Sequence, residues 1–324
     1  MNVARLAGAL LVAAIVLFVA APLARAADLQ PMRVILDWFV NPDHAPLIVA
    51  REKGFFRDAG LEVELIAPAD PNDPPKLVAA KQADLAVSYQ PQLHLQVEQG
   101  LPVVRVGTLV ATPLNSVVVL ADGPVKGVAD LKGRRIGFSV GGFEDALLGR
   151  MLGRHGLTLG DVSLVNVNFS LSPALVAGQV DAVIGAFRNF ELNQLDILGR
   201  PGRAFYPEEE GVPAYDELVY IAHRDSVGDP RLKAFLLAVE RATHWLINHP
   251  DEAWAAFKAT DKLLDDELNR RAWIATLPRL AHSPAALDHG RYARFAAFLK
   301  EQGLIKEAKP VAAYAVDLFA QRQQ

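Results

Sequence analysis

The alternation of apolar and polar positions predicts two similar α/β units in tandem. The first unit has strand-like apolar runs at 33–38, 60–66 and 84–87, with helical patterns between them at 45–53 and 75–81. The second unit repeats this order, with strands at 135–139, 162–167 and 181–184 and helices at 143–155 and 173–178. Because β-α-β-α-β units form parallel sheets with right-handed crossovers, we expect two α/β lobes. A single continuous doubly wound sheet is the alternative.

Two further strand-like segments and a helical tail complete the predicted architecture. Segments 115–120 and 217–222 are interpreted as strands at which the chain crosses between the lobes and returns, and two such strands make a hinge. From about residue 225 the apolar positions follow helical spacing, with helices expected at 232–246, from 250, near 265–275, at 285–302 and at 310–322. We therefore expect one lobe to comprise 27–117 and 222–324, and the other 118–221.

The N-terminus has the pattern of a cleavable signal peptide. Arg5 precedes an unbroken apolar run from 6 to 21, and the residues 24–26 (ARA) form a small-x-small cleavage signature. The run is shorter than the roughly 20 residues that a membrane-spanning helix needs, although an N-terminal anchor is the alternative. We expect residues 1–26 to be removed and the mature protein to be free in a periplasm.

Composition then excludes several classes of protein. The 324 residues include no cysteine, which rules out disulfide scaffolds, thiolate metal sites, Fe–S clusters and cysteine nucleophiles. The net charge of −4 gives no electrostatic footprint for nucleic acid. The sequence has no Walker A run and no G-x-S-x-G elbow, and its eight histidines lack metal-ligand spacing. We therefore expect no catalytic residue, no metal and no cofactor.

Candidate ligand contacts cluster after predicted strand ends, where ligands of parallel sheets bind. Trp38 and His44 lie in a loop after the first strand, Tyr89 follows the third, and Asn189 and Glu191 follow the last strand of the second unit. An Asn amide, or a protonated Glu, offers the donor and acceptor pair that matches an amino group beside a ring nitrogen. The alternatives are packing at a lobe edge for the aromatics, a helix cap for His44 and a first-turn helix acid for Glu191.

A glycine-rich turn at 137–142 (GFSVGG) is a further candidate, because a helix N-terminus can present backbone N–H groups to an anionic or polar ligand. The alternative is a tight turn that needs small residues.

Four motifs together resemble a known family. They are DWFVNPDHAP at 37–46, KGFF at 53–56, GLPVV at 100–104 and GAFRNFEL at 185–192. They are similar to the periplasmic substrate-binding proteins of ABC importers that carry thiamine pyrimidine precursors, formylaminopyrimidine or hydroxymethylpyrimidine, and the resemblance covers about 30–320.

The resemblance implies a type II periplasmic binding fold, a small pyrimidine ligand, an inner-membrane ABC permease as partner and a monomer. It implies that Trp38 and Tyr89 stack on the ligand and that Asn189 and Glu191 bind the pyrimidine edge. It implies lesser contacts from Asn41, His44, Asn115 and Phe187.

Two other functions remain open. The ligand could be another small molecule, such as a riboflavin-like flavin or a sulfonate such as taurine, although Glu191 would repel an anion. A fungal family with the same fold makes the pyrimidine itself, consuming its own histidine and a pyridoxal phosphate held by a lysine. This chain lacks that family's cysteine-rich loop and has Ser88 at the lysine position, so a Schiff base cannot form there. We therefore expect a binding protein and not an enzyme.

Overall fold

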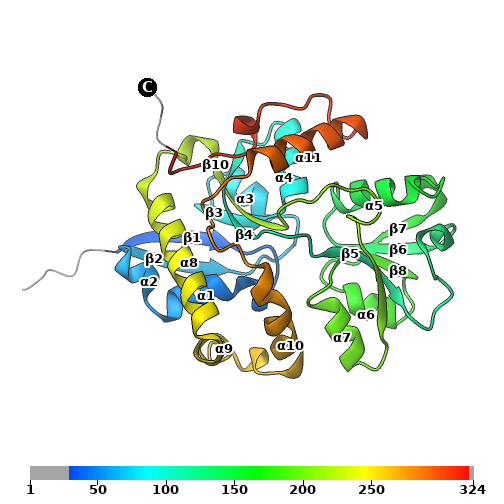
Figure 1. Cartoon of the computed structure of the whole chain (residues 1–324), viewed down its shortest axis with the longest axis horizontal. Helices are drawn as coiled ribbons and strands as arrows, with labels where there is room; N and C mark the ends of the chain where they lie inside the picture. Colours follow the sequence, from blue (N-terminus) through cyan, green and yellow to red (C-terminus); the bar gives the residue numbers. More distant parts are fainter. Residues whose placement is uncertain (1–28, 321–324) are drawn as a thin grey trace, which may run out of the picture.

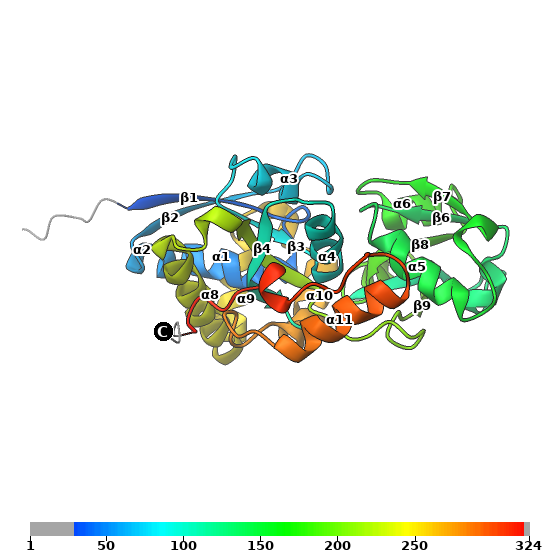
Figure 2. The same ribbon diagram turned by 90° about the horizontal axis from the view of Figure 1, so that it is seen from above.

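Two five-stranded mixed sheets form the framework of the protein. The computed structural model describes residues 29–320, so the predicted signal peptide at 1–26 lies outside the described residues. The first sheet has the order β2-β1-β3-β10-β4 and the second the order β7-β6-β8-β5-β9. Each sheet belongs to one of two lobes that lie side by side (Figures 1 and 2). The prediction of two α/β lobes is confirmed, and the single continuous sheet is not observed.

The two sheets share one topology. The first contains β1 (Gln30–Ile35), β2 (Leu61–Ile66), β3 (Leu85–Ser88), β4 (Val103–Val110) and β10 (Leu218–His223). The second contains β5 (Asn115–Leu120), β6 (Arg135–Phe138), β7 (Ser163–Asn166), β8 (Ala182–Phe187) and β9 (Gly202–Phe205). In the first sheet β1, β2 and β3 are parallel, and β10 pairs antiparallel to β3. In the second sheet β6, β7 and β8 are parallel, and β5 pairs antiparallel to β8. Both antiparallel strands, β10 and β5, follow a connection between the lobes.

The four helices that the apolar spacing predicts between the strands are present, together with three others. The first lobe contains α1 (Ala45–Glu52), α2 (Phe55–Asp58), α3 (Pro74–Ala79) and α4 (Gln90–Glu98), and the second contains α5 (Glu144–Gly153), α6 (Leu171–Val176) and α7 (Glu191–Ile197). The sequence analysis did not identify α2, α4, α7, β4 or β9. Each of these is short or lacks a clear apolar period, and its place depends on neighbours that are distant in the sequence.

The C-terminal helices pack mainly on the first lobe. They are α8 (Pro230–Asn248), α9 (Pro250–Lys258), α10 (Glu267–Thr276) and α11 (His289–Glu301). The predicted apolar face of α8, which includes Phe235 and Val239, is buried, and this helix packs against α1 and α2. Helix α10 also contacts α7 of the second lobe (Figure 1). Within 29–320 no helix is both long and apolar enough to cross a membrane.

The chain passes between the lobes twice, as predicted, through the connections that precede β5 and β10. Strand β5 pairs with β8 and β9 of the second sheet, and β10 pairs with β3 and β4 of the first. The crossings are therefore the segments 111–114 and 206–217. The lobe boundaries at 117/118 and 221/222 stay a prediction; the pairing of the strands favours boundaries a few residues earlier.

The helix predicted at 310–322 is wrong. The structure has only the single 3-10 turn η7 (Val311–Ala313), after which Ala315 forms a bridge to Arg105 in β4. The Arg105 N–H donates to Tyr314 O at 2.8 Å, and the Val316 N–H donates to Arg105 O at 2.9 Å. Pairing with the edge of β4 thus satisfies backbone groups that a helix would have bonded internally.

The side chain of Arg105 in β4 connects the first sheet to the segment around Pro284 by hydrogen bonds. Its side chain is fully buried, and its guanidinium donates to Thr108 Oγ1 at 2.8 Å and to the carbonyl oxygens of Pro284 and Ala285 at 3.2 and 3.3 Å. Removal of the guanidinium would leave these carbonyl groups without their donor, which makes the residue costly to replace.

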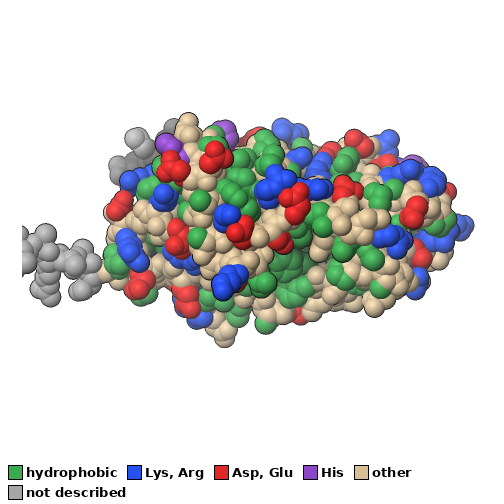
Figure 3. All heavy atoms as spheres, turned by 90° about the horizontal axis from the view of Figure 1, so that it is seen from below, with side chains coloured by type: hydrophobic (Ala, Val, Ile, Leu, Met, Phe, Trp, Pro, Cys, Tyr) green, Lys and Arg blue, Asp and Glu red, His purple; other side chains and the backbone are tan. Residues whose placement is uncertain are grey.

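Charged side chains of both signs are interspersed on the face shown in Figure 3, with hydrophobic side chains between them. This face therefore presents no extended basic stripe of the kind that binds nucleic acid.

We predict that Arg105→Met lowers the free energy of unfolding by roughly 3 kcal/mol, because it leaves several buried carbonyl groups without a donor. Urea denaturation followed by circular dichroism measures this. Arg203→Met is the control, since Arg203 makes a single exposed contact to Lys126 O, and we expect a change within about 0.5 kcal/mol. Equal stability of the two variants would contradict the role of Arg105.

Candidate ligand-binding site

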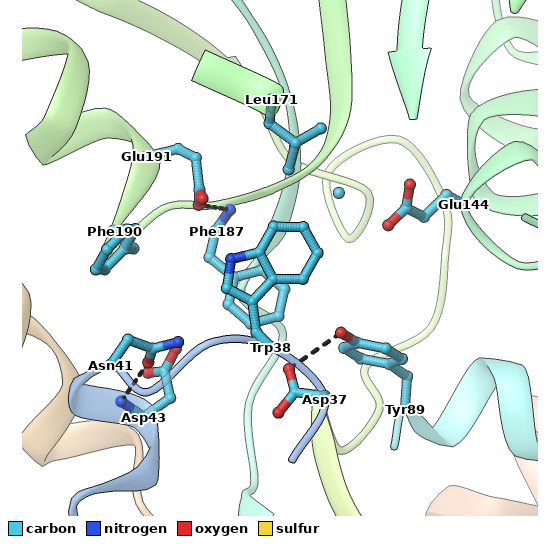
Figure 4. Close-up of a pocket in the computed structure, with 11 residues that line it drawn as sticks. Asp37, Trp38, Asn41, Asp43, Tyr89, Glu144, Leu171, Phe187, Phe190 and Glu191 are labelled. Carbon is cyan, nitrogen blue, oxygen red and sulfur yellow. Dashed lines mark hydrogen bonds between the residues drawn. The ribbon is translucent and has the colours of Figure 1, made fainter. Parts of the chain in front are cut away.

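A pocket lies between the lobes at the carboxyl ends of the parallel strands. About 410 Å³ of space in it is not filled by protein atoms, and part of this space is open to solvent. Asp37 and Trp38 follow β1, Tyr89 follows β3, Glu144 follows β6, and Glu191 follows β8. All five line the pocket (Figure 4). The position is the one expected for a ligand site in sheets of this kind.

Aromatic rings from both lobes meet around the pocket. Trp38 makes an edge contact with Phe169 of the second lobe, with ring centroids 4.5 Å apart. Tyr89 stacks on Phe143 of the second lobe at 4.9 Å and meets the edge of Phe187 at 6.4 Å. Trp38, Tyr89 and Phe187 line the pocket, and their contact with a ligand stays a prediction. These contacts across the cleft describe a closed arrangement of the lobes.

Asp37 connects two of the predicted site residues. Its Oδ1 lies 2.9 Å from His44 Nε2, and its Oδ2 accepts a hydrogen bond from the Tyr89 hydroxyl at 3.0 Å. The Asn41 N–H donates to His44 Nδ1 at 3.3 Å, so the network assigns the proton to Nε2 and makes His44 a donor to Asp37. His44 is fully buried behind Asp37 and caps the turn that begins at Asn41. It orients Asp37 and does not line the pocket.

Asn189 joins the lobes instead of lining the pocket. Its Nδ2 donates to Asp43 Oδ1 at 2.6 Å and to Thr276 Oγ1 at 2.7 Å, both in the first lobe. Its Oδ1 is buried without a partner in the described part of the chain. Burial raises the pKa of Asp43 to about 6. Asn41, which does line the pocket, accepts from the Asp43 N–H at 2.8 Å and thereby fixes this corner.

Asn115 lies beneath the pocket at the first inter-lobe crossing. It is fully buried, and its Oδ1 accepts from the Gly185 N–H at 3.1 Å. Glu217 at the second crossing accepts from the N–H groups of Leu114 and Asn115 at 2.6 and 2.9 Å, so one carboxyl group ties the two crossings together. Burial raises the pKa of Glu217 to about 7.

Two glutamates of the second lobe point into the pocket from helix N-termini. Glu191 begins α7, and its Oε2 accepts from the Phe187 N–H at 2.6 Å. Glu144 begins α5, and its Oε2 accepts from the Ser139 N–H at 2.8 Å. Burial is the main cause that raises the pKa of each carboxyl group to about 8. Near neutral pH these groups therefore hold protons for most of the time.

Two N–H groups of the glycine-rich turn have partners within the protein. The Ser139 N–H donates to Glu144, and the Gly141 N–H donates to Asn72 Oδ1 of the first lobe at 3.1 Å. Asn72 Nδ2 in turn donates to Ser139 O at 3.1 Å. These two groups do not face a ligand in this arrangement of the lobes, and binding of a ligand by the turn stays a prediction.

Sequence reasoning missed six residues that line the pocket: Asp37, Asp43, Glu144, Leu171, Gly185 and Phe190. Asp37 and Asp43 lie in the loop that also carries Trp38. The sequence analysis considered the other side chains of this loop and not these two acids. Glu144 had a usable signal, because it occupies the same place after β6 that Glu191 occupies after β8. Within 29–320 there is no group of His, Asp and Glu side chains suited to hold a metal ion.

Comparison with known proteins places the chain in a family. A model of the family described as "NMT1/THI5 like" matches residues 41–253. A protein of Haemophilus influenzae named for thiamine biosynthesis is 57% identical over 290 residues, covering 89% of this chain and 92% of its own length. The formylaminopyrimidine-binding protein of Halalkalibacterium halodurans is 37% identical over 227 residues, 69% of each chain.

More distant proteins share the fold. The 4-amino-5-hydroxymethyl-2-methylpyrimidine phosphate synthase of Uromyces fabae is 29% identical over 250 residues, 73% of each chain. The alkanesulfonate-binding protein of Xanthomonas axonopodis, solved with MOPS bound, superimposes with a TM-score of 0.70 at 18% identity, covering 90% of this chain and 99% of the other. The chain thus has the fold of the periplasmic binding proteins and belongs to the NMT1/THI5-like family.

Proposed function

We propose that this protein is a periplasmic receptor that delivers a thiamine pyrimidine precursor, formylaminopyrimidine or hydroxymethylpyrimidine, to an ABC importer. The observation that carries the proposal is the pocket between the lobes. It combines aromatic walls with buried carboxyl groups, and among its described lining residues none is Lys or Arg. The names of the Haemophilus and Halalkalibacterium relatives support a pyrimidine as the ligand.

The chemistry of Glu191 suits an aminopyrimidine edge. With its pKa raised to about 8 by burial, the carboxyl group near neutral pH can donate one hydrogen bond and accept another. A ring nitrogen beside an amino group needs this pair of partners. Trp38 and Tyr89 then supply apolar faces for the ring, and Phe187 closes the floor. Asn189 reaches the ligand only in an arrangement of the lobes in which it leaves Asp43.

Closure of the lobes is what distinguishes the receptor with bound ligand from the receptor without it. A ligand that contacts Trp38 and Tyr89 of the first lobe and Glu191 of the second binds the closed form more tightly than an open form, which shifts the population toward closure. The closed form is then the one that docks on the permease. The predicted signal peptide at 1–26 brings the chain to the periplasm.

The residues of the pocket argue against the two alternatives. A sulfonate would meet carboxyl groups and no lining Lys or Arg. A pyridoxal-dependent synthase needs an amine, and Ser88 at that position is buried, with its hydroxyl donating to Gln92 at 2.9 Å. A binding protein therefore accounts better for these side chains than an enzyme does.

The proposed ligand can be tested by thermal unfolding of residues 27–324 with a panel of small molecules. The panel contains formylaminopyrimidine, hydroxymethylpyrimidine, thiamine, riboflavin and taurine. A ligand that binds only the folded protein raises the melting temperature as its concentration increases. We expect this shift for the two aminopyrimidine precursors. A shift for taurine or riboflavin alone would refute the proposed ligand.

The site itself can be tested by substitution. We predict that Trp38→Ala and Glu191→Ala each weaken binding of the pyrimidine by about 1–3 kcal/mol, through loss of ring contact and of the hydrogen-bond pair. Isothermal titration calorimetry measures the affinities. Asp196→Ala, an exposed acid on the same helix as Glu191, is the control and should bind as the wild type does. Unchanged affinity in both pocket variants would place the ligand elsewhere.

The buried glutamates also predict a pH dependence of stability. In the unfolded chain these carboxyl groups titrate near 4.5, whereas in the folded protein burial raises the pKa of Glu144 and Glu191 to about 8. Between these values the folded state binds more protons, so their contribution to the free energy of unfolding decreases as pH rises from about 4.5 to 8.

Chemical denaturation between pH 5 and 8.5 measures this dependence. Because other groups titrate as well, the variant carrying Glu144→Gln and Glu191→Gln is compared with the wild type. We expect the variant to lose less stability than the wild type over this range. Asp196→Asn serves as the control and should retain the wild-type slope. Parallel pH curves for the wild type and the double variant would contradict the buried, protonated state.

A further inference from the structure

Glu144 holds an unusual place between a helix N-terminus and the pocket. It is the first residue of α5, a helix of 10 residues, and its side chain is only 3% exposed. Its Oε2 accepts from the Ser139 N–H at 2.8 Å, the Val140 N–H also hydrogen-bonds the carboxyl group, and the side chain lines the pocket (Figure 4). The backbone of the turn before α5 thus holds the carboxyl group beside the pocket.

The start of α5 is the kind of structure that binds anions in other proteins, because several backbone N–H groups point the same way and the helix dipole favours negative charge. Here two N–H groups of the turn that leads from β6 into α5 are bound by side chains of the protein itself. Glu144 accepts from the Ser139 N–H, and Asn72 accepts from the Gly141 N–H. No external anion can bind the Ser139 N–H while Glu144 occupies it.

Gly185 in β8 leaves space for the Glu144 carboxyl group. Its φ is +93°, a region that favours glycine, and a Cβ built there would lie 2.4 Å from Glu144 Oε1 and 2.6 Å from its Cδ. The carboxyl group therefore fits into a space that only a residue without a side chain leaves open. Two separate features of the chain, the acid at 144 and the glycine at 185, accommodate one another.

The rest of the pocket is equally unsuited to an anion. Asp37, Asp43 and Glu191 also line it, and none of its described lining residues is Lys or Arg. A phosphate or sulfonate group would have to leave water, find the Ser139 N–H already occupied and lie near several carboxyl groups.

We propose that Glu144 determines ligand selectivity in this pocket by occupying the Ser139 N–H in the turn before α5, so that uncharged or protonated heterocycles bind and phosphorylated or sulfonated ones do not. This inference rests on the proposed function in taking the pocket as the ligand site. It adds that the protein distinguishes a free pyrimidine from its phosphate ester, and that Glu144 is responsible.

The test compares two substitutions that differ in whether the position stays filled. Glu144→Ala removes the side chain and frees the Ser139 N–H. Glu144→Gln removes the ionisable group but keeps an amide oxygen that can still accept from Ser139. Calorimetry with residues 27–324 measures binding of inorganic phosphate, hydroxymethylpyrimidine and hydroxymethylpyrimidine phosphate to each protein. Circular dichroism confirms that each variant is folded.

We expect the wild type to bind hydroxymethylpyrimidine at least a hundredfold more tightly than its phosphate ester and to show no binding of inorganic phosphate. Glu144→Ala should bind the phosphate ester at least tenfold more tightly than the wild type, and Glu144→Gln should not. Asp145→Ala is the control: it removes an acid from the same end of α5 but does not line the pocket, and it should retain wild-type selectivity.

Each other outcome overturns the proposal. An equal gain of anion binding in both Glu144 variants would show that charge, and not occupation of the N–H groups, excludes anions. No gain in either variant would show that Glu144 does not determine selectivity. The phosphate measurements need no pyrimidine, so they remain informative if the wild type binds none of the pyrimidines, a result that would refute the proposed function separately.

Discussion

The burial of carboxyl groups where the two lobes meet is the constraint on which the rest of the structure depends. Asp37, Asp43, Glu144, Glu191 and Glu217 are all less than 10% exposed. A carboxyl group removed from water is costly unless it is hydrogen-bonded or protonated. Each of these five therefore needs donors from its surroundings, and the donors come from the loops that form the cleft.

The way these needs are met explains the form of the cleft. Glu191 and Glu144 each turn back to a backbone N–H that precedes their own helix, which fixes the loops after β8 and β6. Glu217 binds backbone N–H groups of the other crossing and so couples the two connections between the lobes. Asp43 takes its donors from Asn189 and Thr276, which are held on different lobes or segments. Closure of the lobes therefore also supplies a hydrogen-bond donor to a buried carboxyl group, that of Asp43.

Fold and ligand are decided by different parts of the chain. The framework of two mixed sheets is shared with a protein named for alkanesulfonate binding at only 18% identity, so the framework alone does not specify what is bound. The side chains at the carboxyl ends of β1, β3, β6 and β8 distinguish this pocket. Its lining combines aromatic side chains with buried carboxyl groups whose pKa is raised by burial.

The sequence by itself determined the two tandem α/β units, the helical tail and the loops that carry Trp38, Tyr89, Phe187 and Glu191, because apolar periodicity and strand ends are local properties of the chain. It could not locate the segment after Pro310, whose backbone pairs with β4 instead of forming a helix. Only the tertiary structure decided which polar side chains face the pocket. His44 and Asn189 lie in the predicted loops, yet they bind Asp37 and Asp43, and Glu144 enters from a turn that seemed to offer free donors. The sequence can place a residue in a loop near the cleft. The hydrogen-bond partners of its side chain depend on buried acids that the fold brings together from distant parts of the sequence.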